Sequence, residues 1–202
     1  MALTPLSGTD LPASGNLDAL VDDVWARIAG GLDGRWPPWA LPTLVTTSKA
    51  GPRARVLALR TALAAERRFV FHCDARSDKV REIEDDARVS VVFWDPTDGV
   101  EARFLGRAVV HRQEEVTHAA WRDVSRLRRL ASRTAKSPGA KLGAPARLDA
   151  LPQASYTDGY ENFAVIHVEV AQLDWLWVGA DDLRRASFEW NGTRWKGAWA
   201  VP

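Results

Sequence analysis

The chain has 202 residues, of which 46% are hydrophobic and 26% are charged, a composition typical of a globular protein that buries its own core. Its 27 basic and 26 acidic residues leave a formal charge of +1, which argues against a protein that works mainly by gripping nucleic acid or an anionic membrane. Cys73 is the single cysteine, which excludes an intrachain disulfide and a zinc site built from several cysteines.

Residues 1–15 are rich in Pro, Gly and Ser and are expected to form a loose N-terminal arm before a single domain over residues 16–202. The arm has neither the basic start nor the apolar stretch of a signal peptide. No run of the sequence approaches the roughly 18 apolar residues of a membrane span. We therefore expect a cytoplasmic protein with no membrane contact.

The first predicted element is a helix that follows Asn16, a residue that often caps helices. Gly30-Gly31 is expected to end this helix. Residues 36–39 (WPPW) predict an extended connector, because a residue before proline avoids the helical region. The helix is recognised by apolar residues at helical spacing: Leu17, Leu20, Val21, Val24, Trp25 and Ile28.

Strands dominate the next part of the chain. A hairpin is predicted from two strands around the turn Lys49–Pro52, and Ser77 is expected to open a short helix. Gly106 predicts a bulge within the last of these strands. The five strands expected here are Pro42–Ser48, Arg53–Arg60, Arg68–Cys73, Arg88–Trp94 and Val100–His111.

Residues 113–131 predict a second long helix, and residues 132–160 carry few regular signals. Asn191-Gly192 lies between two apolar, aromatic runs and is the strongest short hairpin signal in the sequence. The closing strands are expected at Phe163–Val178, Leu183–Trp190 and Thr193–Ala200. Since strands and helices do not alternate, the predicted fold is mainly β, a single antiparallel barrel with flanking helices.

The common catalytic motifs are absent: there is no phosphate-binding P-loop, no nucleophile elbow and no H-E-x-x-H zinc motif. The best chemical signal is Ser77 at a predicted helix start, flanked by Arg76 and Lys79. Free backbone N–H groups and two cations at such a point favour an anion. Ordinary helix caps carry the same residue types, so the spacing alone leaves phosphate binding open.

Four segments, taken in chain order, resemble the pyridoxamine 5′-phosphate oxidase-like family of FMN-binding split β-barrels. They are LVTTSKAGPRARVLALR, RFVFHCDARSDKVREIEDDARVSVVFW, EARFLGRAVV and the C-terminal LDWLWVGADDLRRASFEWNGTRWKGAWAVP. The last segment is similar to the bacterial oxidase-related branch of that family. The resemblance spans about Leu41 to Pro202. It implies a six-stranded antiparallel split barrel and a homodimer that holds FMN between its subunits.

The resemblance also implies which residues hold the flavin. By match, Arg60 lies near the reactive edge of the ring. The other positions are those lining the flavin (Arg55, Val56, Leu57, His72 and Cys73), those around the phosphate (Arg76, Ser77 and Lys79), Glu101 where a flavin-contacting Gln is usual, and Trp177 with the pair Arg184-Arg185 in the segment that completes the site. In one regular strand Arg55 and Arg60 would point to opposite faces, so a single cofactor meets both only near a bulge or a strand end.

The chain departs from the oxidases proper at three places. Asp78 stands where they carry an Arg on the phosphate, and Glu101 replaces an amide by a carboxylate. The R-x-H pattern that holds their substrate is missing, since residues 182–185 read DLRR. The resemblance therefore implies FMN binding without naming vitamin B6 compounds as substrates.

Three functions follow as hypotheses. The first is an FMN-dependent oxidoreductase that passes a hydride between the flavin and a small substrate, with an anion among the candidates and no catalytic side chain identified. The second is a non-catalytic flavin-binding or redox-sensing protein. The third, a nucleic-acid-binding barrel, would use the basic helix around Arg122–Arg133, and we do not expect it. Two other hypotheses for that helix stay open. The resemblance implies that it captures an anionic substrate beside the flavin. In the simpler alternative it is a solvated helix that packs an apolar stripe on the barrel: Trp121, Val124, Leu127 and Leu130.

Overall fold

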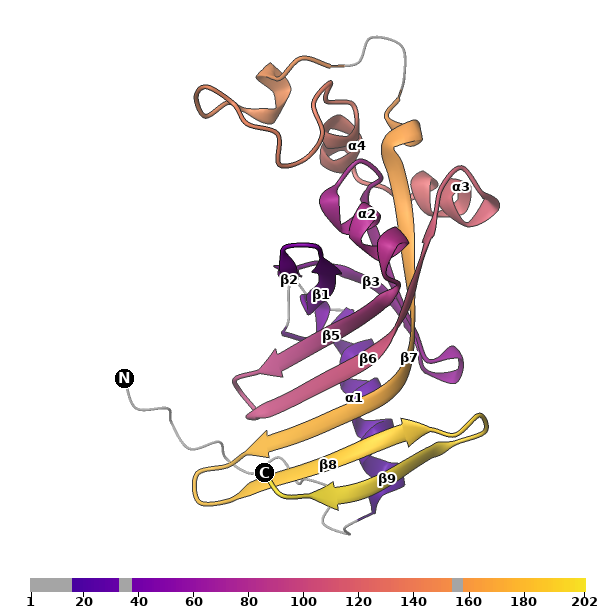
Figure 1. Cartoon of the computed structure of the whole chain (residues 1–202), viewed down its shortest axis with the longest axis vertical. Coiled ribbons are helices and arrows are strands. Elements are labelled where there is room, and N and C mark those ends of the chain that lie inside the picture. Colours follow the sequence, from indigo (N-terminus) through magenta and orange to yellow (C-terminus); the bar gives the residue numbers. More distant parts are fainter. Residues whose placement is uncertain (1–15, 33–37, 154–157) are drawn as a thin grey trace.

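The computed structural model describes residues 16–32, 38–153 and 158–202. The predicted N-terminal arm, residues 1–15, lies outside the described residues. Within them, nine strands form one sheet whose neighbouring strands are all antiparallel, and helices flank it (Figure 1). The predicted fold class, mainly β with flanking helices, is confirmed.

The elements have the following bounds. The strands are β1 Thr43–Ser48, β2 Gly51–Val56, β3 Leu59–Leu63, β4 Arg68–Asp74, β5 Arg88–Asp95, β6 Val100–His111, β7 Phe163–Val178, β8 Leu183–Trp190 and β9 Trp195–Ala200. The α-helices are α1 Leu17–Leu32, α2 Asp78–Asp85, α3 Glu115–Arg122 and α4 Arg126–Ser132. Short 3-10 turns occupy Pro38–Ala40, Ala64–Glu66, Leu148–Ala150 and Tyr160–Asn162.

The strand predicted over Arg53–Arg60 is divided in two, and this division gives the split barrel. The strand order is β2-β1-β5-β6-β7-β4-β3, so β2 and β3 stand at opposite ends of the path although they are consecutive in the chain. Leu57 and Ala58 join them, and the Leu57 N–H donates to the carbonyl of Pro42 at 3.0 Å. The sheet curls until both ends meet this one segment, while β8 and β9 extend the sheet beyond β7.

The core lies between the sheet and α1, which crosses behind β5–β9 in Figure 1. Val24 and Ile28 of α1 are fully buried. They share this core with Phe69, Phe93 and Phe104, whose rings meet edge to face with centroids 5.0 to 6.0 Å apart, an arrangement that aromatic quadrupoles favour. The described helices leave the other face of β5–β8 uncovered (Figure 1).

Two predictions near the N-terminus are wrong. The helix α1 does not end at Gly30-Gly31 but continues to Leu32. A side chain on Gly31 would come within 2.6 Å of the Trp39 Cβ, so this glycine permits close packing instead of ending the helix. The predicted extended connector is a 3-10 turn from Pro38, where the Trp39 Nε1–H donates to Asp95 Oδ2 at 2.8 Å; residues 36 and 37 lie outside the described residues.

The long helix predicted over residues 113–131 is also wrong, because the chain breaks it into α3 and α4. Ser125 caps α4 by accepting a hydrogen bond from the Arg128 N–H, and this cap begins a new helix in a new direction. The apolar stripe is consequently broken as well. Trp121 and Val124 are buried, but Leu127 is 66% exposed.

Two local predictions that rest on glycine are confirmed. The pairing of β6 with β7 shifts register between Leu105 and Gly106, and a Cβ at Gly106 would lie 2.2 Å from the carbonyl oxygen of Glu169. In the β8–β9 hairpin, the Asn191 side chain accepts the N–H groups of the next turn residues and Gly192 has a φ of +101°.

Among the described residues, no helix combines the length and the apolar character that a membrane crossing by a helix requires.

Candidate functional site

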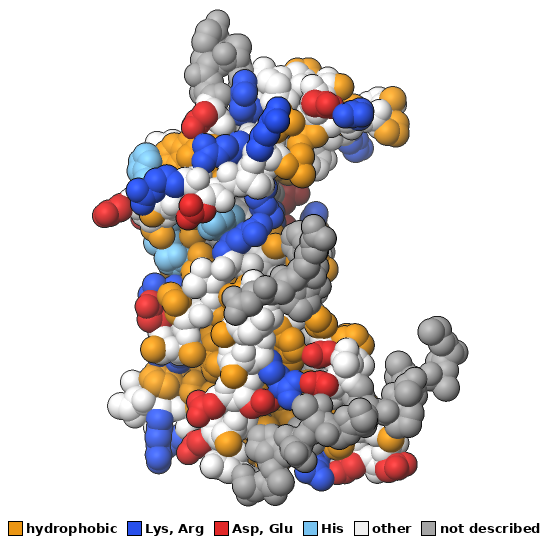
Figure 2. Space-filling view, turned by 180° about the vertical axis from the view of Figure 1, so that it is seen from behind, with side chains coloured by type: hydrophobic (Ala, Val, Ile, Leu, Met, Phe, Trp, Pro, Cys, Tyr) orange, Lys and Arg blue, Asp and Glu red, His pale blue; other side chains and the backbone are white. Residues whose placement is uncertain are grey.

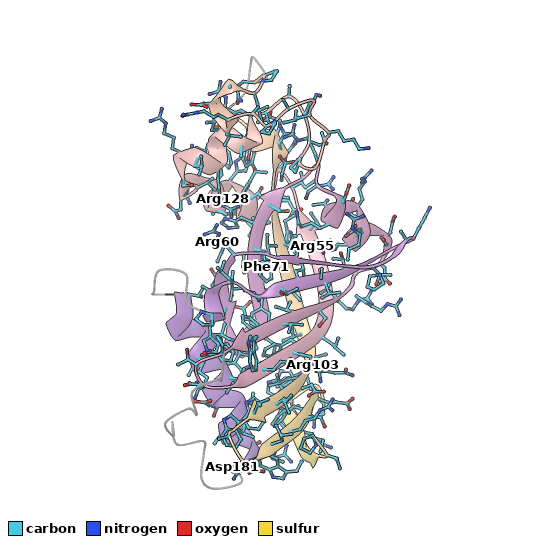
Figure 3. All side chains as sticks on the ribbon, turned by 90° about the vertical axis from the view of Figure 1, so that its left-hand side faces the viewer. Arg55, Arg60, Phe71, Arg103, Arg128 and Asp181 are labelled. Atoms are coloured by element: carbon cyan, nitrogen blue, oxygen red, sulfur yellow. The ribbon has the colours of Figure 1, made fainter. Side chains whose placement is uncertain are left out.

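A cavity of about 490 Å³ lies between the upper end of the barrel and the pair α3–α4. Arg60 enters it from β3, His72 from β4 and Arg128 from α4. Figure 3 shows Arg60 and Arg128 side by side in the upper half of the molecule. Apolar residues form much of the remaining wall: Val70, Val116, Ala119, Ala120, Val124 and Val165.

Two guanidinium groups, those of Arg60 and Arg128, and one carboxylate, that of Asp123, line the cavity. Burial lowers the pKa of the Arg60 guanidinium, and the charge of Arg128 lowers it further. The Nε of Arg60 is buried and has no hydrogen-bond partner among the described residues. Burial also lowers the pKa of His72 to about 4, helped by the charges of Arg60 and Arg128 and opposed by Asp123. At neutral pH the cavity therefore presents two guanidinium groups, an uncharged imidazole and the one carboxylate of Asp123, and this excess of guanidinium groups suits an anion.

Basic side chains and imidazoles gather over the upper part of the molecule, where α3 and α4 lie (Figure 2). They do not all face solvent. The Arg129 guanidinium donates to the carbonyl oxygens of Trp121 and Val124 at 2.7 and 3.0 Å and lies over the Trp121 ring. Arg129 therefore fastens α4 to α3, and Arg128 points into the cavity.

Arg55 lies in a second group of polar side chains, at the contact between α2 and strands β1 and β2. Its Nη2 donates to Glu82 at 2.8 Å and its Nη1 donates to the Thr46 hydroxyl at 2.6 Å. Thr46 and Glu82 are themselves buried. Since the break at Leu57 separates the two strands, Arg55 and Arg60 no longer follow the alternation of one strand and serve different surroundings.

The start of α2 brings two of the predicted phosphate residues together. Ser77 is the N-cap residue, but its hydroxyl donates to the Asp74 carbonyl at 2.6 Å instead of capping the helix. The Lys79 ammonium donates to the same hydroxyl at 3.0 Å. Asp78 forms ion pairs with Arg53 and Arg81, as a first-turn acid that points away from a phosphate would.

Arg76 has a different environment from the one predicted for a phosphate ligand. Its Nε and Nη2 donate to the two carboxylate oxygens of Asp74 at 3.0 and 2.7 Å. Its Nη1 donates to the carbonyl of Thr134 at 2.8 Å. Arg76 thus ties the turn after β4 to the segment that follows α4.

Three further predicted residues have distinct surroundings. Cys73 is buried in the core on the face of β4 opposite His72, and burial raises the pKa of its thiol to about 11. Leu57 packs half-buried against the core. Val56 is 62% exposed on the barrel surface. The structure places Val56 and Leu57 next to the break between β2 and β3, and not in the cavity of Arg60.

Glu101 and Arg185 lie in a third group, on the uncovered face of β6–β8. Arg185 donates to both carboxylate oxygens of Asp174 at 3.0 and 2.6 Å, and Arg103 lies between Asp174 and Glu101. Figure 3 shows Arg103 in the lower half, well away from Arg60 and Arg128. A second cavity, about 520 Å³, is lined by Arg103, Asp174 and Arg185.

Trp177 does not share the face of Arg185. Directly opposed pairs in the β7–β8 ladder are Trp177 with Arg184 and Leu176 with Arg185, so alternation sends Trp177 and Arg185 to opposite sides of the sheet. Trp177 packs half-buried against the core, with the Arg184 guanidinium 5.6 Å from its ring centroid.

One chain thus holds the predicted residues in separate groups, of which Arg60 with His72 and Glu101 with Arg185 lie far apart. Sequence reasoning did not single out four residues that organise these groups: Thr46, Glu82, Arg103 and Asp174. Arg128 stood in the arginine-rich run, but a run of basic residues does not tell which of them points inward. The partners of Arg55 and Arg185 come from other elements, so sequence spacing carried no signal for them.

Comparison with known proteins gives a consistent picture. A family model described as pyridoxamine 5′-phosphate oxidase matches residues 41–144. A pyridoxamine 5′-phosphate oxidase-related, FMN-binding protein from Nostoc punctiforme aligns with a TM-score of 0.70 at 17% identity, covering 91% of this chain and 96% of that chain. PhzG from Burkholderia lata, solved in complex with tetrahydrophenazine-1-carboxylic acid, gives a TM-score of 0.73 at 19% identity, with 97% and 98% covered. A search of curated proteins gave no match. At these identities the likeness to solved structures shows the fold.

Proposed function

We propose that this chain, which belongs to the pyridoxamine 5′-phosphate oxidase family, is an FMN-binding oxidoreductase that acts on a small anionic molecule. The observation that carries the proposal is the cavity in which the guanidinium groups of Arg60 and Arg128 converge and in which Asp123 is the one carboxylate among the described lining residues. Bound FMN would supply hydride transfer, and the protein would supply binding, orientation and charge. A cytoplasmic location remains a prediction.

The residues at the start of α2 fit a phosphate group. The Val80 N–H donates to the Ser77 carbonyl at 3.0 Å. The Ser77 hydroxyl does not cap the helix, so it leaves the N–H groups of Asp78 and Lys79 and the positive end of the helix dipole to an anion. The Lys79 ammonium lies 3.0 Å from that hydroxyl. A phosphate there would receive charge-assisted hydrogen bonds, worth about 1.5–3 kcal/mol each.

The unpartnered Nε of Arg60 is a second feature that fits a ligand. A buried donor without a partner costs about 1–3 kcal/mol, and an acceptor atom of a flavin or of a substrate would remove that cost. His72, uncharged at neutral pH because its pKa is lowered to about 4, can offer one hydrogen bond without adding charge. These side chains would orient a ligand and exclude water from it.

The separation of the site residues supports a homodimer. Glu101 and Arg185 lie on a sheet face that the described helices leave uncovered (Figure 1). Trp94 and Leu105 are 47% and 50% exposed on the same face, and a second copy of the chain on this face would cover both. A second copy of the chain, with this face turned toward Arg60 and His72, would complete a flavin site between the two subunits.

The cavity wall indicates the kind of substrate. Valine and alanine side chains form part of the wall beside the two guanidinium groups, together with polar residues, which suits a molecule with an apolar body and one carboxylate or phosphate. The ligand in the PhzG structure, a ring system with a carboxylic acid, is of this kind. The two observations agree on the chemical class of the ligand, an apolar body with one acidic group.

The test is the visible spectrum of the purified protein after incubation with FMN and desalting, together with its mass in solution by light scattering. We expect a two-banded flavin spectrum with one FMN per subunit of a dimer, and turnover with NAD(P)H or an anionic substrate. Retained FMN without turnover on any such substrate would favour the flavin-binding or redox-sensing function instead. A protein that retains no FMN would contradict the proposal.

A further inference from the structure

Four charged side chains form a continuous network of ion pairs across β6, β7 and β8. Glu101 and Arg103 form an ion pair, with 3.0 Å between Oε1 and Nε. Arg103 Nη2 also donates to Asp174 Oδ2 at 2.8 Å. Asp174 in turn accepts two hydrogen bonds from Arg185. Negative and positive groups alternate along this network, so each carboxylate has at least one guanidinium partner.

The sheet register explains why these residues meet. Arg103 lies directly opposite Asp174, and Glu101 precedes Arg103 by two residues, so all three share one face. Arg185 reaches Asp174 diagonally from β8, where it is paired with Leu176. Leu176 itself faces Glu101. Glu101, Leu176 and Arg185 therefore lie side by side on neighbouring strands. The pair Arg103 and Asp174 lies two residues farther along β6 and β7 and connects Glu101 to Arg185.

The ion-pair network balances the negative charge of Glu101. A carboxylate accepts hydrogen bonds but donates none, and it opposes negative charge on a neighbouring group. The charge close to the rings of a flavin affects its binding and its reduction potential. A Glu101 carboxylate without a positive partner would therefore weaken the binding of a flavin. The two hydrogen bonds from Arg185 and one from Arg103 overcome the effect of burial on Asp174 and keep its pKa below the usual value, so Asp174 stays charged and holds both guanidinium groups.

We infer that Arg103 is a positioning residue for FMN, which neutralises and orients Glu101 and, through Asp174, fixes Arg185 on the same face. The inference rests on the proposed function. Arg103 acts here through its neighbours and needs no contact of its own with the flavin. The Arg103 side chain is 40% exposed. Among the ion pairs of the described residues, only those of Arg103 connect Glu101 to Asp174.

A double-substitution cycle tests this inference, with FMN affinity measured by quenching of flavin fluorescence. Arg103→Met should weaken FMN binding at least tenfold, while Arg103→Lys, which keeps the charge, should stay within threefold of the parent. Combined with Glu101→Gln, which removes the charge that Arg103 balances, Arg103→Met should cost less than twofold. Arg107→Met is the matched control, because Arg107 lies on the same strand and face but outside the network.

The reduction potential of the bound flavin gives a second readout that loss of fold would not imitate. Arg103→Met should make the potential more negative, since the unbalanced carboxylate opposes added electrons, and Glu101→Gln should restore it. An equal loss of affinity with Glu101 and with Gln at 101, or no loss beyond that of Arg107→Met, would overturn the inference while FMN binding by the parent still stands. Failure of the parent protein to bind FMN would overturn the proposed function itself, and the inference with it.

Discussion

Arg60 on β3 and Arg128 on α4 share one cavity, and the charge of Arg128 lowers the pKa of Arg60. Two guanidinium groups in a half-buried site repel each other, and Asp123 is the one carboxylate that lines the same cavity among the described residues, so an anion that enters would lower the free energy of the arrangement. The fold maintains it because Ser125 starts α4 at this point and Arg129 binds the helix back to α3. Relief of this repulsion would add to the affinity of the cavity for a negatively charged ligand.

The contribution of Arg128 to ligand binding can be measured directly. Arg128→Met should weaken binding of a small aromatic carboxylate or of inorganic phosphate about tenfold, or about 1.4 kcal/mol, because one charge-assisted contact is lost. Isothermal titration calorimetry provides the affinity. Arg126→Met serves as the control, since Arg126 belongs to the same helix but is exposed and lies outside the cavity. Equal effects of the two substitutions would show that the cavity does not take the anion.

His72 should remain uncharged well below neutral pH. Its pKa is lowered from 6.5 to about 4 by burial and by the charges of Arg60 and Arg128. In the unfolded chain the imidazole would bind a proton near pH 6.5, so the folded state loses stability as pH falls from about 6.5 toward 4 and regains it on return.

The measurement for His72 is an NMR titration of the imidazole C–H signals, assigned with a His72→Phe variant. We expect a midpoint near pH 4, and a rise of that midpoint when an anion fills the cavity, because a negative charge favours the protonated ring. A midpoint near the ordinary value in the absence of ligand would contradict the electrostatic description of the cavity.

The proposed phosphate contact predicts a specific role for Lys79. Lys79→Met should weaken FMN binding about tenfold by removing a charge-assisted hydrogen bond, with little change in melting temperature of the ligand-free protein. Arg81→Met is a suitable comparison, because Arg81 lies on the same helix, is exposed and pairs with Asp78. If riboflavin, which lacks the phosphate, loses as much affinity as FMN does, Lys79 does not bind the phosphate.

Gly106 is expected to be indispensable to the β6–β7 pairing. Gly106→Ala should lower the free energy of unfolding by about 3 kcal/mol or more, because the new Cβ would lie 2.2 Å from the carbonyl oxygen of Glu169. Urea denaturation followed by tryptophan fluorescence measures the change. Gly30→Ala gives the opposite control: nothing lies within 4 Å of a Cβ there, so this helical site should gain up to about 1 kcal/mol. A neutral Gly106→Ala would mean that the bulge adapts.

Local patterns in the sequence predicted the class of the fold and several of its details. Alternation of apolar residues located most strands, and glycine chemistry located the bulge at Gly106 and the turn at Asn191-Gly192. These features depend on residues close together in the chain, which is why local patterns predict them. The ordered motifs also indicated the family to which the chain belongs.

The division of the strand predicted over Arg53–Arg60 and the direction of each arginine side chain depend on contacts between distant parts of the chain, which local patterns do not carry. The break at Leu57-Ala58 exists because β2 and β3 pair with strands at opposite ends of the sheet, and Ser125 divides a helix whose composition alone is continuous. Arg55, Arg76 and Arg128 read alike in the sequence, yet they meet a buried glutamate, a neighbouring aspartate and an open cavity. A charged side chain is placed by partners distant in sequence, because electrostatic pairing depends on distance in space and leaves no period along the chain.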